Sequence, residues 1–324
     1  MPVWLPNGLR PKVIYLHLSP VDKALLNRVK SKQGVHFLKG FTSMTDTPPL
    51  FSTLIQAAQL EALYHAKSHL AIFDCRAKLG APGWGPQAFD IGHLPAAQFL
   101  DLDLDLADPP GAQGRHPLPD IARWHARVRT LGVTNETQVI VYDDAQGAFA
   151  ARAWWMFRWL GHEGVAVLDG GMPAWSGQLT KDLVEPCPSD FERQPPLTRS
   201  IDTTTLQEML EQADQPSHHL IDARSHARFA GLEEPIDPVA GHIPGALCLP
   251  FQDNLNSAGR WLAAPTLAAR FNHLDDPVIC YCGSGVTACH NILALKIAGR
   301  AEPILYPESW SGWITDPDRM IATQ

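Results

Sequence analysis

The sequence has no long apolar run, no dense cysteine pattern and no excess of basic charge. No stretch of about 18 consecutive apolar residues occurs, so a membrane-spanning helix is not expected. The net charge of −8 argues against nucleic-acid binding as the main function. The six cysteines are widely spaced, which does not indicate a disulfide framework and fits a reducing cytoplasm. We therefore expect a cytoplasmic globular protein.

Positive charge is concentrated in the first 43 residues, which carry seven Lys or Arg and one acidic residue. His17, Pro20 and Asp22 interrupt the most apolar part of this segment, so a secretory signal is not expected. We expect residues 1–43 to be a disordered extension or translated upstream sequence before a natural start at Met44. An organelle-targeting peptide is the alternative interpretation.

From Leu50 onward the chain contains the same design twice, at a spacing of about 140 residues. Four sequence features of the first copy have a match in the second copy, in the same order. The matching pairs are 70–76 with 219–224, 92–97 with 241–246, 139–143 with 278–282, and Trp175 with Trp313. A repeat of this length indicates a duplicated domain rather than a solenoid. We predict one domain at 50–180 and a second at 201–324, joined by a proline-rich linker at 181–200.

Each copy alternates short apolar strands with helices. The first copy predicts helices over 57–65, 119–131 and 149–160, and strands over 70–74, 138–142 and 165–168. The second predicts helices over 203–212, 265–273 and 286–298, and strands over 220–222, 278–281 and 304–306. This order indicates an α/β fold of two domains, each a mainly parallel sheet with helices on both faces. Ligands of such sheets bind beyond the carboxyl ends of the strands.

One stretch places a thiol at such a strand end. Strand 278–281 is followed by the loop Cys282-Gly-Ser-Gly-Val-Thr287 and then by a helix. Small residues let the N–H groups of a loop turn inward and form an anion-binding nest. The helix N-terminus adds about half a positive charge there. We predict that Cys282 is a thiolate nucleophile and that the loop binds anions through Gly283, Ser284, Gly285, Val286 and Thr287.

The first copy lacks this nucleophile. Asp143 stands where the second copy has Cys282, and the following Asp144-Ala-Gln-Gly-Ala148 contains no thiol. A carboxylate at this place would repel an anionic ligand. We therefore expect only the second copy to be catalytic, with the first copy supplying part of the cleft wall.

The duplicated domain, the repeated Gly-His-Φ-Pro motif and the Cys282 loop resemble those of tandem rhodanese-type sulfurtransferases, over roughly residues 50–324. Within that family the loop is similar to that of the 3-mercaptopyruvate sulfurtransferases. The resemblance implies that an anionic donor transfers a sulfane sulfur to Cys282, which leaves a cysteine persulfide. An acceptor such as cyanide, a small thiol or a protein thiol then removes the sulfur. No metal or organic cofactor is implied.

Two other functions stay open. Thiosulfate is the alternative donor, although thiosulfate sulfurtransferases more often carry cationic residues just after the cysteine. A non-enzymatic persulfide carrier or partner-binding module is the other alternative. A cysteine phosphatase is not expected, because it needs an arginine at the end of the loop, where this chain has Ala288. Zinc is not expected at Cys280, Cys282 and Cys289, because Cys289 falls two turns into the helix and tetrahedral sites usually take their ligands in two spaced pairs.

An anionic donor needs a cation, and the resemblance assigns this role to Arg228. A guanidinium binds a carboxylate or sulfonate through two hydrogen bonds. The competing interpretation is an ion pair of Arg228 with Glu233 or Glu234. Arg224 has a counterpart, Arg76, in the first copy, so we expect it to form a structural ion pair.

The segment after Arg228 departs from the family. The mercaptopyruvate enzymes carry a second substrate arginine some nine residues further on, where this chain has Asp237 in a shortened loop. An acid at this place is expected to weaken the binding of an anionic donor. The departure therefore leaves the identity of the donor open.

Two further residues are candidates for proton transfer. Ser284 is expected to hydrogen-bond the donor or to relay a proton. The family also uses a histidine of the first domain, and His93 in Gly92-His-Leu-Pro95 matches it. The competing interpretation of His93 is a structural turn, because His242 occupies the same motif in the second copy.

Overall fold

The computed structural model of the chain describes residues 50–66, 68–211 and 219–324. These residues belong to one compact unit. The predicted extension at 1–43 and the last residue of the predicted helix 203–212 lie outside the described residues. Among the helices described, none combines the length and the apolar character needed to cross a bilayer.

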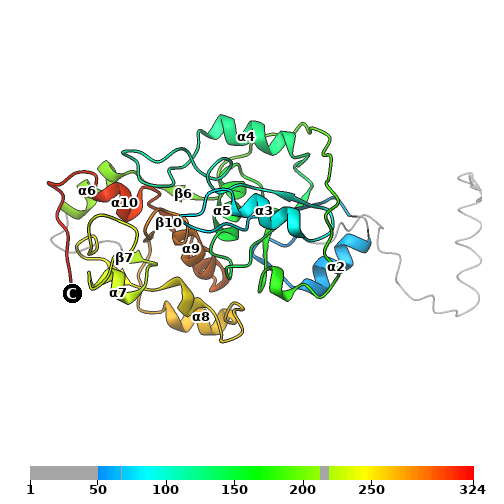
Figure 1. The fold of residues 1–324 in the computed structure, drawn as a ribbon. Helices are drawn as coiled ribbons and strands as arrows, with labels where there is room; N and C mark the ends of the chain where they lie inside the picture. Colours follow the sequence, from blue (N-terminus) through cyan, green and yellow to red (C-terminus); the bar gives the residue numbers. More distant parts are fainter. Residues whose placement is uncertain (1–49, 67, 212–218) are drawn as a thin grey trace, which may run out of the picture. The chain divides into compact units, whose positions relative to one another are not determined.

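The first copy contains a five-stranded parallel sheet, with helices on both faces (Figure 1). The strand order is β1-β5-β4-β2-β3, so the central strand is β4. In chain order its elements are β1 Leu54–Ile55, α2 Ala57–His65, β2 Leu70–Asp74, α3 Trp84–Ile91, β3 Ala97–Phe99, α4 Ile121–Thr130, β4 Gln138–Tyr142, α5 Ala150–Trp159, β5 Val165–Leu168 and the 3₁₀ helix η1 Met172–Ala174.

The second copy repeats this architecture in the order β6-β10-β9-β7-β8, again with all strands parallel. Its central strand, β9, is the one that ends at Cys282. In chain order the elements are β6 Arg199–Ser200, α6 Thr203–Glu211, β7 His219–Asp222, α7 His226–Phe229, β8 Leu247–Cys248, the 3₁₀ helix η2 Phe251–Asn254, α8 Ala264–Arg270, β9 Val278–Tyr281, α9 Ala288–Ile297, β10 Ile304–Leu305 and α10 Ser309–Trp313.

The prediction of two α/β domains with mainly parallel sheets is confirmed. The predicted strands and helices are present, with ends that differ by a few residues; α9, for example, begins at Ala288 rather than at 286. The elements that were not predicted are short strands and short helices: β1, β3, β6, β8, α3, α7, α10 and the 3₁₀ helices η1 and η2. Two- and three-residue strands carry too few side chains to show a period of two, which explains why they were missed.

Each sheet is anchored by the same buried ion pair at its carboxyl end. In the first copy, Arg76 Nη2 lies 2.7 Å from an oxygen of Asp74 and also donates to the Gly92 carbonyl. In the second, Arg224 Nη2 lies 2.6 Å from Asp222 and also donates to the Gly241 carbonyl. The pair thus joins β2 or β7 to the Gly-His-Φ-Pro turn, as expected for a structural arginine.

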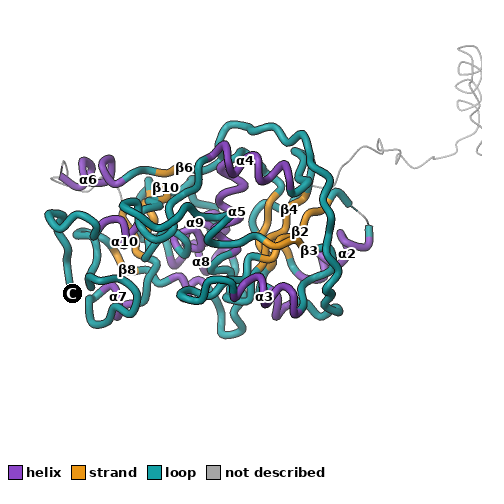
Figure 2. Tube along the Cα trace, turned by 45° about the horizontal axis from the view of Figure 1, so that its top comes forward, coloured by secondary structure: helices purple, strands orange, loops and turns teal. Residues whose placement is uncertain are grey.

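The two copies meet through helices α5 and α9, which lie side by side in both views (Figure 1, Figure 2). Both helices are almost completely buried, and one hydrophobic core continues from the first copy into the second. Since α9 begins directly after the Cys282 loop, this interface places the first copy against the loop.

A fully buried arginine of α5 connects the interface to the loop. Arg152 donates to the Gly285 carbonyl at 3.2 Å and, within the first copy, to the carbonyls of Leu106, His116 and Pro117 at 3.3 to 3.5 Å. A guanidinium carries five N–H donors and no acceptor, so it suits a site lined by carbonyl oxygens. Arg152 therefore holds the loop of one copy to the 106–117 segment of the other.

We predict that Arg152→Met lowers the free energy of unfolding by about 2–4 kcal/mol, because four buried carbonyl groups lose a charged donor. Chemical denaturation followed by tryptophan fluorescence measures this difference. Arg129→Met is the matched control: the Arg129 side chain donates to the Ser189 carbonyl at the surface, and its loss should cost less than about 0.5 kcal/mol. Equal effects of the two substitutions would contradict the role of Arg152.

Candidate active site

Cys282 stands at the carboxyl end of the central strand β9 and is buried, with 2% of its surface exposed. Its backbone is fixed from the segment after β10: its N–H donates to Ser309 Oγ at 3.1 Å, and its carbonyl accepts from the Trp310 N–H at 3.0 Å. Gly285 turns the loop with φ of 75°, and a Cβ there would collide with the Pro307 carbonyl. The thiol is therefore held rigidly.

The loop presents unused N–H groups beside this thiol. The Ser284 N–H points at Cys282 Sγ at 3.5 Å. Within the described part of the chain, the N–H groups of Gly283, Gly285, Val286 and Thr287 donate to no protein acceptor. An unpaired N–H group in a buried loop is costly unless a ligand or water satisfies it. This loop is therefore suited to hold a negative charge next to the sulfur.

The first copy shows the same loop with its anion in place. The Asp143 carboxylate, at the end of β4, accepts four backbone N–H groups, from Ala145, Gly147, Phe149 and Ala150, at 2.8 to 2.9 Å. The fold thus forms an anion-binding nest at the carboxyl end of each central strand. In the first copy the nest is filled by the chain itself, which agrees with the expectation that this copy is not catalytic.

A cavity of about 330 Å³ opens over the Cys282 loop. Its wall comes from both copies: the first contributes Leu79, Arg115, Ala145, Ala148 and Phe149, and the second contributes Ala223, Arg224, Ser225, Arg228, Phe251, Gln252 and residues of the loop itself, among them Cys282, Gly283, Ser284, Val286 and Thr287. The structure therefore brings together Cys282, the loop residues and Arg228, all of them expected site residues, in one cavity. Gly285 supports the loop from behind.

Arg228 lines this cavity and is held by two carboxylates. Its Nη2 lies 2.6 Å from Glu234 and 3.1 Å from Asp237. The ion pair of Arg228 with Glu234, which was the alternative to a substrate-binding role, is therefore present, and it is nearly buried. It leaves Arg228 Nη1 without a protein acceptor among the described residues. Arg224 also borders the cavity while bonded to Asp222, so its structural pair stands at the edge of the site.

The structure does not bring His93 to the cavity. Its ring lies 3.7 Å from the Phe89 ring in a stacked arrangement, and its two nitrogens lie 2.9 Å and 3.1 Å from the carbonyls of Phe89 and Asp182. His242 of the second copy stacks on Phe229 in the same way, at 3.6 Å. This corrects the expectation that His93 relays protons: the repeated Gly-His-Φ-Pro histidine closes a turn.

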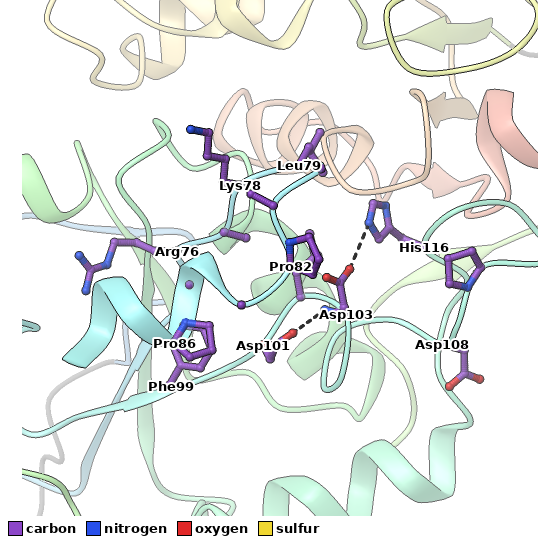
Figure 3. A pocket seen from close by; sticks show the side chains of 17 residues that line it. Arg76, Lys78, Leu79, Pro82, Pro86, Phe99, Asp101, Asp103, Asp108 and His116 are labelled. Carbon is purple, nitrogen blue, oxygen red and sulfur yellow. Dashed lines mark hydrogen bonds and ion pairs between the residues drawn. The ribbon is translucent and has the colours of Figure 1, made fainter. Parts of the chain in front are cut away.

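A different histidine of the first copy reaches Ser284. His116 Nδ1 lies 2.7 Å from Ser284 Oγ. On the other side of the ring, His116 Nε2 lies 3.5 Å from a carboxylate oxygen of Asp103 (Figure 3). His116 and Asp103 also line a second cavity of about 300 Å³, which adjoins the first at Leu79. The chain Asp103–His116–Ser284 thus ends at the hydroxyl of a loop residue whose backbone nitrogen lies 3.5 Å from Cys282 Sγ.

The surroundings of His116 keep its ring neutral. Burial and the nearby guanidinium groups of Arg152 and Arg115 lower the pKa of His116 to about 4. A carboxylate can only accept a hydrogen bond, so Asp103 favours the tautomer with the proton on Nε2. Nδ1 then accepts the hydroxyl proton of Ser284. The neutral ring of His116 therefore keeps a lone pair on Nδ1 directed at the Ser284 hydroxyl.

The residues that the sequence did not reveal come from one loop. Arg115 and His116 belong to Gly114-Arg-His116, between β3 and α4, and its counterpart in the second copy is Gly259-Arg-Trp261. The two loops cross over reciprocally: the Arg115 N–H bonds Ser311 of the second copy, and the Trp261 N–H bonds Asp169 of the first, both at 3.0 Å. The Gly-Arg match, with His in one copy and Trp in the other, was the available signal.

No group of three or more His, Cys, Asp or Glu side chains placed to hold a metal ion occurs within residues 50–66, 68–211 and 219–324. All six cysteines are free thiols. Cys280, in the strand before Cys282, and Cys289, in the helix after it, are both buried. Burial raises the pKa of the Cys289 thiol to about 12, so this neighbour stays protonated at neutral pH. The chemistry of the cavity therefore rests on one sulfur and on the charged side chains around it.

A second buried histidine makes stability depend on pH. Burial lowers the pKa of His290 to about 3, and this effect outweighs the bond to the Gln146 carbonyl, which favours the protonated ring. The ring is stacked on Trp261 and bonded to Asn254. An unfolded chain binds this proton below about pH 6.5, whereas the folded chain does not, so acidification favours unfolding.

We therefore predict that the free energy of unfolding falls between pH 6.5 and 4, and that His290→Gln makes this decline shallower by up to about 1.4 kcal/mol per pH unit. Denaturant titrations at several pH values measure the slope. His65→Gln, at a side chain that is 70% exposed, is the control and should leave the slope unchanged. The same slope in His290→Gln as in the parent chain would contradict the prediction.

Comparison with known proteins agrees with this geometry. The Rhodanese-like domain family matches residues 56–178 and 203–316. A probable 3-mercaptopyruvate sulfurtransferase of Pseudomonas aeruginosa is 48% identical over 281 residues, which cover 83% of this chain and 98% of the relative. A putative thiosulfate sulfurtransferase, SseB, of Mycobacterium tuberculosis is 38% identical and covers 83% of this chain and 96% of its own length.

Among solved structures, the 3-mercaptopyruvate sulfurtransferase SseA of Escherichia coli superimposes with a TM-score of 0.68 at 31% identity, covering 80% of this chain and 98% of that one. The Tum1 protein of Saccharomyces cerevisiae superimposes with a TM-score of 0.72 at 25% identity, covering 85% and 99%. The chain belongs to the rhodanese-like family and has the tandem-domain form of the 3-mercaptopyruvate sulfurtransferases.

Proposed function

We propose that the chain is a sulfurtransferase in which Cys282 takes a sulfane sulfur from an anionic donor and passes it to a thiophilic acceptor. The observation that carries this proposal is the contrast between the two nests. The nest of the first copy is filled by the Asp143 carboxylate, whereas the N–H groups beside Cys282 have no protein acceptor. A persulfide on Cys282 places an anionic sulfur where those groups stabilise it.

The favoured donor is 3-mercaptopyruvate. The Cys282 thiolate attacks the thiol sulfur of the donor, the carbon–sulfur bond breaks, and its electron pair stays on carbon as the enolate of pyruvate. The thiol proton of the donor must end on that carbon to give pyruvate, and the new persulfide remains anionic. Charge and atoms balance only if a group moves this one proton, which is a task for a side chain with a free lone pair.

The Asp103–His116–Ser284 chain meets this requirement. Ser284 accepts the thiol proton of the donor while His116 Nδ1 takes the hydroxyl proton of Ser284, and the proton returns along the same path to the enolate carbon. The contact of 2.7 Å between His116 and Ser284 supports this role, as does the neutral ring of His116. Asp103 orients the ring and supports the positive charge that forms briefly.

Thiosulfate is the alternative donor. Its transfer releases sulfite and moves no proton, so the Ser284–His116 contact has no task in that reaction. Thiosulfate is also a dianion, and the wall around Arg228 pairs its three arginines with three carboxylates: Arg115, Arg224 and Arg228 with Asp222, Glu234 and Asp237. A site with balanced charge suits a monoanion better than a dianion, which favours 3-mercaptopyruvate.

The acceptor is a small thiophile, such as cyanide or a thiol, or the thiol of a protein. Such an acceptor attacks the outer sulfur of the persulfide and regenerates the Cys282 thiolate. Because the cycle depends on a reduced cysteine, we propose the reducing cytoplasm as its place of work. A persulfide carrier without turnover is the second candidate, and the proton chain at His116 argues for an enzyme instead.

We predict that Cys282→Ser abolishes sulfur transfer from either donor, because a serine hydroxyl at neutral pH is not a comparable nucleophile. Steady-state assays with cyanide as acceptor measure the loss. Cys187→Ser, at an exposed thiol outside the cavity, should keep full activity. Activity retained by Cys282→Ser with any donor would exclude the persulfide mechanism.

Because transfer from 3-mercaptopyruvate moves a proton and transfer from thiosulfate does not, the effect of a His116 substitution should depend on the donor. His116→Gln should lower kcat with 3-mercaptopyruvate by about 10²-fold or more, in the range expected for loss of an acid–base catalyst, and should change kcat with thiosulfate by less than about threefold. The two donors are compared on the same protein preparation, so a folding defect lowers both rates together. Equal losses with both donors would contradict the proton relay.

A further inference from the structure

Arg115 has no part in the proposed proton transfer, although it lies at the cavity over Cys282. It belongs to the first copy, yet its side chain lines the cavity over Cys282 and is 24% exposed. It is bonded through Nη1 to Asp237 of the second copy, whose side chain is 2% exposed. A nearly buried ion pair thus joins two loops from different copies at the wall of the cavity over Cys282.

The free end of this guanidinium points at the catalytic loop. A Cβ added to Gly283 would lie 2.8 Å from Arg115 Nη2 and 3.5 to 3.6 Å from the two terminal nitrogens of Arg228. The guanidinium groups of Arg115 and Arg228 therefore both lie next to Gly283, the residue after Cys282. Among the described residues, Arg115 Nη2 and Arg228 Nη1 donate to no protein acceptor, so both still have N–H groups for a ligand.

We propose that Arg115 binds the donor: it holds the donor's carboxylate together with Arg228, and Asp237 aims its guanidinium into the cavity. This inference rests on the proposed sulfurtransferase function. A carboxylate between two guanidinium groups accepts hydrogen bonds from both, which strengthens the binding of the donor. The binding site is then complete only when both copies are in place.

The proposal gives Asp237 a role that its charge alone does not suggest. An isolated acid beside Arg228 weakens anion binding, but Asp237 bonds both arginines, Arg115 through Oδ1 and Arg228 through Oδ2. It brings two like charges close together and lowers their mutual repulsion. With Glu234, which also pairs with Arg228, the two arginines and the two carboxylates balance in charge, so a monocarboxylate such as 3-mercaptopyruvate is accommodated more readily than a dianion.

The test substitutes Arg115 by Met, which removes the charge and keeps the length of the side chain. We expect the KM for 3-mercaptopyruvate to rise at least about tenfold, with kcat changed less than about threefold and the KM for cyanide unchanged, as for a residue that binds the donor uniformly. Arg129→Met, at a surface arginine outside the cavity, is the matched control and should alter none of these values.

Two further variants separate the role of Arg115 from a folding defect. Arg115→Lys keeps the charge and loses the planar fork, so its KM should fall between those of the parent chain and Arg115→Met. Gly283→Ala keeps Arg115 and places a methyl group where Arg115 Nη2 lies, so it should raise the KM for the donor as well. Unchanged donor KM in both Arg115→Met and Gly283→Ala would overturn the proposal.

A measurement without turnover distinguishes this inference from the proposed function. Pyruvate, the product from a 3-mercaptopyruvate donor, should protect Cys282 from alkylation by iodoacetamide, and Arg115→Met should weaken this protection about tenfold. If the parent chain transfers sulfur but Arg115→Met leaves both the donor KM and the protection within twofold, the Arg115 proposal fails and the sulfurtransferase stands. If the parent chain transfers no sulfur and the protection still depends on Arg115, the proposed function fails and the carboxylate site stands.

Discussion

The structure depends on one constraint: the buried loop at the carboxyl end of each central strand presents N–H groups that need a negative partner. In the first copy a side chain of the same loop, Asp143, supplies four acceptor contacts and closes the site. In the second copy the Ser284 N–H points at Cys282 Sγ, and the N–H groups of Gly283, Gly285, Val286 and Thr287 have no protein acceptor among the described residues. In the proposed mechanism, a persulfide on Cys282 is the anion that completes this loop.

The rest of the site follows from the reciprocal packing of the two copies. Because α5 and α9 pack together and Arg152 donates to the Gly285 carbonyl, the Gly114-Arg-His116 loop of the first copy lies over the Cys282 loop. The matching Gly259-Arg-Trp261 loop lies over the closed nest of the first copy, where Trp261 stacks on His290 at 3.8 Å.

One duplicated arrangement has thus diverged at two places. The second copy has Cys282 where the first has Asp143, and His116, which contacts the Cys282 loop at Ser284, comes from the first copy. A catalytic domain separated from its partner would keep the thiol and its loop, and would lose both Arg115 and His116. This explains how a copy without a nucleophile is part of the active site.

The sequence predicted the features that local patterns determine. The duplication, the parallel sheets and the strand–loop–helix around Cys282 all follow from apolar periodicity and from small residues in a loop, and these signals are local. The repeated Asp–Arg pairs were recognised because both copies carry them. Arg228 was placed at the cavity by resemblance, and the structure adds its bonds to Glu234 and Asp237.

The contacts between the copies could not be predicted in the same way. Asp103 and His116 lie more than 160 positions before Ser284 in the sequence, and no local pattern marks which loop crosses the interface. The expectation for His93 was wrong because the Gly-His-Φ-Pro motif recurs in both copies, where its histidine has the same structural position. Residues with a role in only one active site are found instead where the two copies differ. Comparing Gly114-Arg-His116 with Gly259-Arg-Trp261 identifies such a difference.

The central claim is that Cys282 carries the transferred sulfur in a loop that stabilises it. Intact-protein mass spectrometry after reaction with 3-mercaptopyruvate in the absence of an acceptor tests this most directly. The account predicts a gain of one sulfur, about 32 Da, located by peptide mapping at Cys282 and removed by cyanide, which is the behaviour of a persulfide. No gain in mass, or a gain on Cys187 or Cys289 instead, would contradict it.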